Sequence, residues 1–164
     1  MVAERLEADI DMENRELISF FKEANCAFHL RSKKKQSVIQ EMVHYLAESG
    51  SISDEEFIIE MLKNRESLGS TGLGNGVAFP HGRSLAIKKL TVLFARSAKG
   101  IDFEALDGKP TRIFFLILAP SDRGAETYLS LLSELISLVQ KQDKLERLYN
   151  VTDFAELIEI LGGH

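Results

Sequence analysis

The sequence predicts a single α/β layered domain. Two segments, residues 91–95 and 112–119, are rich in β-branched and aromatic residues, which is typical of buried strands. Segments with apolar residues at helical spacing come before and after them, so strands and helices interleave along the chain. With 164 residues, of which 45% are hydrophobic and 27% charged, the chain is long enough to bury one full core, and two are not expected.

The N-terminal part is expected to contain an acidic arm and two helices. Residues 1–15 form the predicted arm, and residues 13–23 fit either a helix or a continuation of the arm. After Ser32, apolar residues recur at helical spacing until Gly50 ends the helix. The residues of that apolar face are Val38, Ile39, Met42, Val43, Leu46 and Ala47.

A second helix is predicted to start at a capping box. Ser53 and Glu56 have the spacing of that motif, in which each side chain bonds the other residue's backbone N–H. Its apolar face is predicted to hold Phe57, Ile58, Met61 and Leu62. The small-residue stretch 69–76 cannot continue a helix, and Val77–Phe79 leaves it as an extended segment.

The C-terminal half supplies the buried strands and two more predicted helices. Residues 107–110, Asp-Gly-Lys-Pro, are predicted to form a turn between the strands. The helix over residues 125–141 is the clearest in the sequence, and Asp153 is expected to cap a last helix. The predicted inward residues of the long helix are Leu129, Leu132, Leu135, Ile136 and Val139.

Charge is distributed unevenly along the chain. The net charge of −5 argues against general nucleic-acid binding. Residues 63–100 nevertheless hold seven basic residues against Glu66 alone, a local charge of +6, so the remainder sums to −11. This pattern fits either a site that meets an anion or a group of solvated lysines beside a strand.

Several features predict a cytoplasmic protein without a membrane span. The longest apolar run, Ile113–Ala119, has seven residues, whereas a membrane helix needs about 20. The acidic start lacks the basic and apolar regions of a secretory signal. The single Cys26 cannot form an internal disulfide and is expected to be a buried structural thiol.

Common catalytic motifs are absent. The four histidines and Cys26 show no metal-ligand spacing, so no metal and no cofactor are expected. Neither Gly-Lys-Ser/Thr nor Gly-x-Gly-x-x-Gly occurs in the glycine stretch, and no Gly-x-Ser-x-Gly elbow is present.

His81 is the remaining candidate for chemistry. Pro80 restricts its own φ and that of Phe79, so the backbone entering His81 is stiff. Gly82 has no Cβ, which would let a ligand or partner approach closely. A neutral imidazole can attack phosphorus, and a nearby arginine would offset the phosphate charge. The alternative is that His81 simply ends a strand.

Residues 64–83 as a whole closely resemble the phosphorylation-site signature of fructose/mannitol-type enzyme IIA domains of the bacterial phosphoenolpyruvate-dependent phosphotransferase system. Residues 103–110, 114–120 and 129–161 are similar to later parts of the same family. The resemblance implies an enzyme IIA (type 2) domain over residues 16–164. It also implies a mixed, mostly parallel five-stranded sheet with helices on both faces.

The resemblance also implies roles for single residues. His81 stands where the family accepts a phosphoryl group from the histidine of the carrier HPr, and Arg65 matches the arginine beside it. Thr71 and Gly72 match the loop next to the site. Arg83 is expected to assist the phosphate or to pair with an acid. Tyr128 stands where family members commonly carry a second histidine, and it could instead be an ordinary helix residue.

Two functions fit this resemblance. In the first, the chain is a phosphocarrier of the sugar phosphotransferase system that passes phosphate from HPr, through His81, to a cysteine of an enzyme IIB. In the second, it is a nitrogen-regulatory enzyme IIA that signals by docking on regulatory proteins according to its phosphorylation state. A degenerate domain that binds without being phosphorylated is a third, less favoured interpretation.

Overall fold

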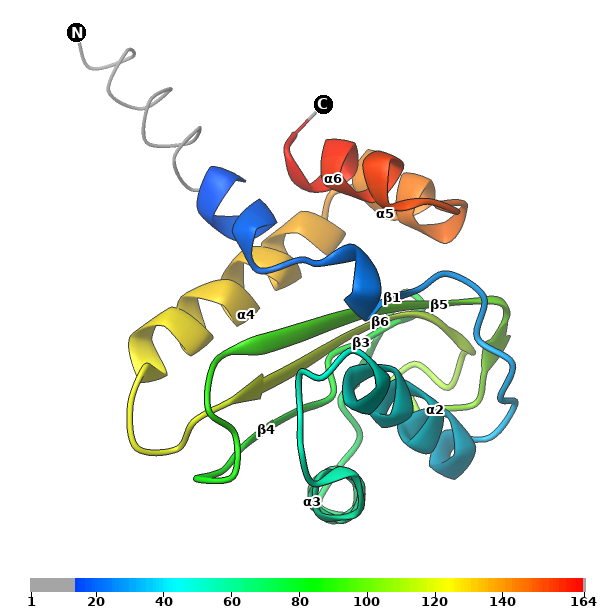
Figure 1. The fold of residues 1–164 in the computed structure, drawn as a ribbon. Coiled ribbons are helices and arrows are strands. Elements are labelled where there is room, and N and C mark those ends of the chain that lie inside the picture. The colour runs from blue at the N-terminus through cyan, green and yellow to red at the C-terminus, as the bar shows by residue number, and fades with distance from the viewer. Residues whose placement is uncertain (1–13, 164) are drawn as a thin grey trace, which may run out of the picture.

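The computed structural model describes residues 14–163 and consists of one sheet between two layers of helices (Figure 1). The helices are α2 (Lys35–Glu48), α3 (Glu55–Ser67), α4 (Ala125–Val139), α5 (Gln142–Tyr149) and α6 (Phe154–Leu161), with a short 3-10 helix η1 (Glu23–Asn25). The helices α4–α6 cover one face and α2 and α3 cover the other, which confirms the predicted α/β fold with helices on both faces. Residues 14–19 are also helical, whereas residues 1–13 of the predicted acidic arm lie outside the described residues.

The sheet has the strand order β1-β5-β6-β3-β2, and β4 also pairs with β6. The strands are β1 (Cys26–Ala27), β2 (Gly72–Gly74), β3 (Val77–Ala78), β4 (His81–Arg83), β5 (Thr91–Ile101) and β6 (Thr111–Ala119). Three pairs of neighbouring strands are parallel: β1 with β5, β3 with β6, and β4 with β6. β5 with β6 and β2 with β3 are antiparallel, so the sheet is mixed and mostly parallel, as expected.

The sheet contains six strands where five were expected, because one strand position is split in two. β3 pairs with Ile113 and Phe114 of β6, and β4 continues along the same strand from Ile117. The interruption falls at Phe79 and Pro80. Proline has no backbone N–H for the ladder, and the N–H of Phe79 donates instead to the Thr71 carbonyl at 3.0 Å. His81 therefore begins a new short strand.

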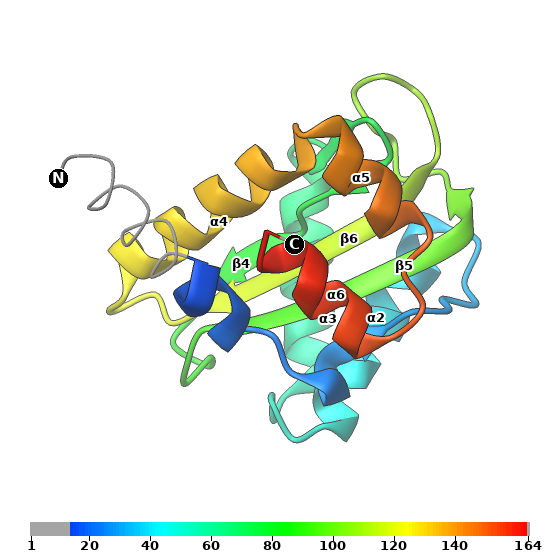
Figure 2. The ribbon, with the colours of Figure 1, turned by 90° about the horizontal axis from the view of Figure 1, so that it is seen from above.

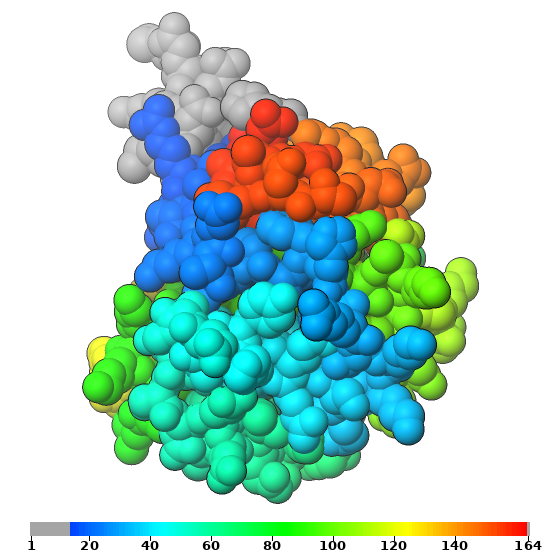
Figure 3. All heavy atoms as spheres, turned by 45° about the vertical axis from the view of Figure 1, so that its right-hand side comes forward, coloured from blue at the N-terminus to red at the C-terminus, as the bar shows by residue number. Residues whose placement is uncertain are grey.

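The side chains of the two long strands, β5 and β6, contribute to two separate hydrophobic cores, one on each face of the sheet. Along β6, Ile113, Phe115 and Ile117 pack under α4–α6, whereas the residues between them pack against α2 and α3. Side chains alternate between the faces of a strand, so a strand covered on both faces must be apolar throughout. This requirement explains the unbroken apolar run that predicted β6. Figure 3 shows α5–α6 and α2–α3 at opposite ends of the molecule, with the segment that leads into α2 between them.

Four local predictions were wrong. Phe57, predicted on the apolar face of α3, is 46% exposed. Asp54, not Ser53, caps α3, since its side chain accepts the Phe57 N–H at 3.1 Å. Leu129 is 59% exposed, because α4 turns Tyr128 and Leu131 inward instead. α4 carries leucines on several sides, so its sequence alone offered more than one apolar stripe. α5 was not predicted as a separate helix, and Asp153 caps α6 as expected.

Candidate functional site

His81 is the first residue of β4, and the sheet holds its backbone. It pairs with Ile117 of β6, whose N–H donates to the carbonyl of the preceding Pro80 at 2.9 Å. The His81 Nδ1 lies 2.7 Å from the Phe79 carbonyl oxygen. A carbonyl only accepts, so Nδ1 carries the proton and donates, which leaves the lone pair of the neutral ring on Nε2. His81 is half-buried, and Nε2 is the ring nitrogen that keeps its lone pair.

Arg65 reaches this region from the last turn of α3. Its Nη1 donates to the Gly69 carbonyl at 2.9 Å, so the side chain is bound to the loop that follows the helix. α3 packs directly against β4. A Cβ on Gly82 would lie 2.6 Å from the Met61 Cε of α3, so a larger residue there would displace the end of the Met61 side chain. The expected approach of a ligand to Gly82 is therefore replaced by the approach of Met61.

Tyr128 and Arg83 complete the surroundings of His81. α4 runs alongside the sheet edge that contains β4 (Figure 2), and the Tyr128 ring centroid lies 6.3 Å from that of His81. The Arg83 guanidinium lies 5.5 Å from the Tyr128 ring centroid. Its Nε and Nη2 donate to the Pro120 carbonyl at 3.0 and 2.8 Å. Arg83 thus ties β4 to the loop that leads into α4, and no acid pairs with it among the described residues.

The Tyr128 hydroxyl is a neutral group in a positive field. Burial raises the pKa of this phenol, and the charges of Arg83 and Arg65 act in the opposite direction. Tyr128 lies against His81 and Arg83, and α3, which carries Arg65, packs against β4, so these four residues form the candidate site. The hydroxyl makes no hydrogen bond to any other group within residues 14–163. It is protonated at neutral pH and available as a donor.

Thr71 and Gly72 lie in the neighbouring loop, with their polar groups already bound. The Thr71 N–H donates to Glu66 Oε2 at 3.1 Å, and its hydroxyl donates to Glu66 Oε1. The Gly72 N–H donates to Ser70 Oγ at 3.0 Å. A Cβ on Gly72 would lie 3.0 Å from the Ala105 Cα, so this glycine permits close packing. Both residues shape the loop, and neither has a free donor for a phosphate.

Two residues beside the site were missed by sequence reasoning. Lys35, the last of three consecutive lysines, has a side chain only 10% exposed and pairs with Glu66 at 3.0 Å. Glu66 itself is 4% exposed at its side chain. The available signal was its position as the one acid among seven basic residues in 63–100.

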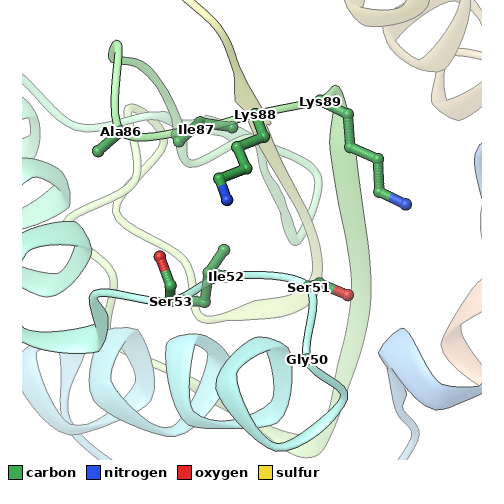
Figure 4. A pocket seen from close by; sticks show the side chains of 8 residues that line it. All are labelled: Gly50, Ser51, Ile52, Ser53, Ala86, Ile87, Lys88 and Lys89. Carbon is green, nitrogen blue, oxygen red and sulfur yellow. The ribbon is translucent and has the colours of Figure 1, made fainter.

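The basic residues of that segment do not all gather at His81. Arg96 is buried elsewhere and donates to the carbonyls of Tyr149 and Phe28. Lys88 and Lys89 line a pocket of about 280 Å³ between loops 50–53 and 86–89, with Lys88 pointing into it (Figure 4). This pocket includes none of the predicted site residues. Only part of the local positive charge, that of Arg65 and Arg83, therefore belongs to the candidate site.

Other titratable residues lie apart from this site. Burial, and secondarily the Glu23 charge, raises the pKa of the Cys26 thiol to about 12, so it is not a thiolate at neutral pH. His44 is exposed beside Glu48 and Glu55. Within residues 14–163, no three His, Cys, Asp or Glu residues are grouped as a metal would require. The same residues include no helix both long and apolar enough to cross a membrane.

Residues 19–163 match the protein family described as "Phosphoenolpyruvate-dependent sugar phosphotransferase system, EIIA 2". The chain belongs to this family. It is 38% identical over 128 residues to the PTS system fructose-specific EIIA component of Haloferax volcanii, covering 78% of this chain and 82% of the relative. It is 36% identical over 133 residues to a nitrogen regulatory protein of Bradyrhizobium diazoefficiens, covering 81% and 86%.

Longer relatives and a solved structure agree with this assignment. The chain is 35% identical over 136 residues, 83% of its length, to the PTS system fructose-specific EIIABC component of Bacillus subtilis, and it spans only 21% of that protein. The crystal structure of nitrogen regulatory protein IIA-Ntr from Neisseria meningitidis superposes with a TM-score of 0.82 at 32% identity, covering 88% of this chain and 98% of that one. The EIIA family and fold expected from residues 64–83 are thereby confirmed.

Proposed function

We propose that this chain is a phosphocarrier of the phosphoenolpyruvate-dependent sugar phosphotransferase system. It accepts a phosphoryl group from the phosphohistidine of HPr on His81 Nε2 and passes it to a cysteine of an enzyme IIB. The observation that carries the proposal is the orientation of His81: Nδ1 is engaged by the Phe79 carbonyl, and the lone pair of Nε2 remains for attack. The EIIA family provides the reaction class.

The proposed transfer balances without a cofactor or metal. The Nε2 lone pair attacks phosphorus and forms a P–N bond, while the P–N bond of the HPr phosphohistidine breaks and its electron pair returns to the HPr imidazole. In the second step, a thiolate of enzyme IIB attacks phosphorus, and the electron pair of the Nε2–P bond returns to His81. The proton on Nδ1 stays in its bond to Phe79 throughout. Such transfers depend mainly on positioning and charge stabilisation.

The surrounding side chains have distinct proposed roles. Arg65 and Arg83 offset the negative charge of the phosphoryl group, because hydrogen bonds from charged donors to phosphate oxygens are stronger than those from neutral donors. The neutral Tyr128 hydroxyl donates a hydrogen bond to a phosphoryl oxygen, where a second histidine commonly stands in the family. Thr71 and Gly72 support the phosphate indirectly, because their donors hold the loop instead.

Exposed leucines next to the site are proposed to receive the two partners in turn. Leu68, Leu73, Leu85 and Leu129 are 85%, 46%, 76% and 59% exposed, and each follows a site residue by one to three positions. Exposed apolar groups that surround a polar centre are typical of interaction surfaces. One related solved structure is described as a complex of enzyme IIAMTL and phosphorylated enzyme IIBMTL from Escherichia coli. These partners would place the chain in the cytoplasm.

A regulatory role is the second candidate. It is favoured by the relatives described as nitrogen regulatory proteins, including the Bradyrhizobium protein and the Neisseria structure. In this role, phosphorylation of His81 would change the local charge by about −2 and thereby change which proteins dock. The two functions share the first transfer and differ in what receives or reads the phosphoryl group.

Intact-mass measurement with phosphoenolpyruvate, enzyme I and HPr tests the shared step. We expect the mass gain of one phosphoryl group in the wild type and none in His81→Ala. A wild type that stays unmodified while HPr becomes phosphorylated would refute both functions. Adding an enzyme IIB then separates them: loss of the phosphoryl group to its cysteine supports the carrier, whereas retention with phosphorylation-dependent docking on a regulatory protein supports the second role.

A further inference from the structure

Lys35 and Glu66 form a buried ion pair between α2 and α3. Lys35 Nζ lies 3.0 Å from Glu66 Oε2, and the two side chains are 10% and 4% exposed. Lys35 also contacts Glu104 at 3.2 Å and lies 4.7 Å from the centroid of the Phe103 ring. Burying such a pair carries an unfavourable free energy of desolvation, and removing one partner leaves the other charge uncompensated. Glu66 directly follows the site residue Arg65 on α3, so the pair is joined to the candidate site through that helix.

The Glu66 carboxylate binds the loop at two donors. Oε2 accepts the Thr71 N–H at 3.1 Å, and Oε1 accepts the Thr71 hydroxyl. The Lys35 ammonium is thus the cation that balances a carboxylate already engaged by the loop. Both Thr71 groups need that carboxylate, because buried donors left without an acceptor destabilise a structure.

From Thr71, hydrogen bonds continue to His81 itself. The Thr71 carbonyl accepts the Phe79 N–H at 3.0 Å, and the Phe79 carbonyl accepts His81 Nδ1–H at 2.7 Å. The path Lys35–Glu66–Thr71–Phe79–His81 therefore alternates donors and acceptors from an ammonium group to the imidazole. Chains of this kind polarise one another and fix the orientation of their last member.

The same loop also holds Arg65. Glu66 directly follows Arg65 on α3, and its own carbonyl accepts the Gly69 N–H at 3.1 Å. The Gly69 carbonyl accepts Arg65 Nη1 at 2.9 Å. The Glu66 backbone carbonyl thus holds Gly69, which in turn binds Arg65, while the Glu66 carboxylate holds Thr71 in the same loop.

We propose that Lys35 and Glu66 are positioning residues for phosphoryl transfer at His81, a role that rests on the proposed function. They hold Thr71 and, through Phe79, keep the proton on His81 Nδ1 and the lone pair on Nε2. Neither residue contacts the reacting atoms. Their loss is expected to disturb the tautomer and orientation of His81, and with them the rate of transfer, beyond any loss of stability.

Glu66→Gln tests this role with two kinds of measurement. The ¹⁵N NMR shifts of the His81 ring report which nitrogen carries the proton, and they need no partner protein. Phosphorylation rates are measured with phospho-HPr and with phosphoramidate, a small phosphoryl donor that needs no docking surface. We expect a mixture of tautomers and a rate about 10- to 100-fold lower with both donors, since misplacement by about 1 Å can cost about 100-fold. The KM for phospho-HPr should stay within about twofold of the wild-type value, because the substitution does not change contacts that bind phospho-HPr equally in the ground state and the transition state.

Matched variants separate positioning from stability. Ile160→Val removes one methylene from the core on the other side of the sheet and serves as a control with lowered stability. Thr71→Val removes only the hydroxyl donor and should reproduce part of the effect if Glu66→Gln does not fold, whereas Thr71→Ser should restore it. Lys35→Met combined with Glu66→Gln removes both charges and should recover stability relative to either single variant.

The outcomes are distinguishable. Wild-type ring shifts and wild-type rates in folded Glu66→Gln or Thr71→Val, with only the stability loss of Ile160→Val, would overturn the proposal. If the wild type accepts no phosphoryl group from either donor, the proposed function fails. A tautomer change in Glu66→Gln would in that case still support the positioning of the His81 ring.

Discussion

Replacing Tyr128 with phenylalanine removes one hydroxyl from the His81 site and leaves the ring in place. The ring is 6% exposed and lies 6.3 Å from the imidazole, with the Arg83 guanidinium 5.5 Å from its centroid. Those contacts need only the ring, so the variant should keep the packing of α4. No hydrogen bond to the described residues is lost, and the free energy of unfolding should change by less than about 1 kcal/mol.

The expected effect falls instead on the phosphoryl group. A hydrogen bond to a charged group contributes about 1.5–3 kcal/mol, and each 1.36 kcal/mol changes a rate or equilibrium tenfold. If the hydroxyl donates to a phosphoryl oxygen on Nε2, Tyr128→Phe should slow transfer from phospho-HPr by about 10- to 150-fold. If this hydrogen bond forms only in the transition state of transfer, kcat and kcat/KM should fall by the same factor.

Quenched time courses with phospho-HPr in excess, read by intact mass, measure this rate directly. Tyr45→Phe is the matched control, because Tyr45 packs partly buried against the other core. The thermal midpoints of both variants show whether folding is intact. Equal rates and equal phosphorylation equilibria for wild type, Tyr128→Phe and Tyr45→Phe would refute the role of the hydroxyl, and Tyr128 would then be an ordinary packing residue.

Three further predictions concern stability and reactivity. Gly82→Ala should lower the free energy of unfolding by no more than about 1 kcal/mol, because its Cβ would lie 2.6 Å from Met61 Cε, the end of a flexible side chain that can shift; a loss above about 3 kcal/mol in denaturant titration would contradict this. Cys26, whose pKa burial raises to about 12, should react with a thiol reagent at pH 8 only after unfolding; rapid labelling of the folded chain would contradict this. Backbone N–H groups of Lys109 and Asn75 lower the pKa of Asp107. A carboxyl with a lowered folded-state pKa stabilises above its unfolded pKa of about 3.9 and loses that effect as pH falls through the folded value. Thermal midpoints should therefore fall less steeply below about pH 4 in Asp107→Asn, and parallel acid profiles would count against it.

Much of the fold could be predicted from local pattern. The apolar run Ile113–Ala119 required a strand covered on both faces, and Gly50 and Asp153 marked helix ends that the structure retains. The order of strands could not be read in this way, since pairing depends on contacts distant in sequence. Pro80 could have revealed the split of β3 from β4, because its missing N–H is a local property.

The residues of the candidate site also differ in whether local sequence or contacts distant in sequence reveal them. His81, Arg65, Arg83 and Tyr128 were recognised from their types and from the resemblance of their segments to one family. Other contacts around the site depend on residues from different elements, which local sequence does not reveal. Thr71 gives its donors to Glu66, and Gly82 makes room for Met61.

By itself, the sequence determined the two long strands and most of the helices, and it singled out His81 as the candidate for chemistry, because periodicity, proline geometry and residue type act locally. Only the tertiary structure decided which nitrogen of His81 holds the lone pair, since that depends on the Phe79 carbonyl 2.7 Å away. It also decided that Lys35 is buried against Glu66 instead of solvated. Residue type fixes the charge of a side chain and the hydrogen bonds that it can donate. Which of these interactions it makes depends on the group that folding brings within hydrogen-bond distance.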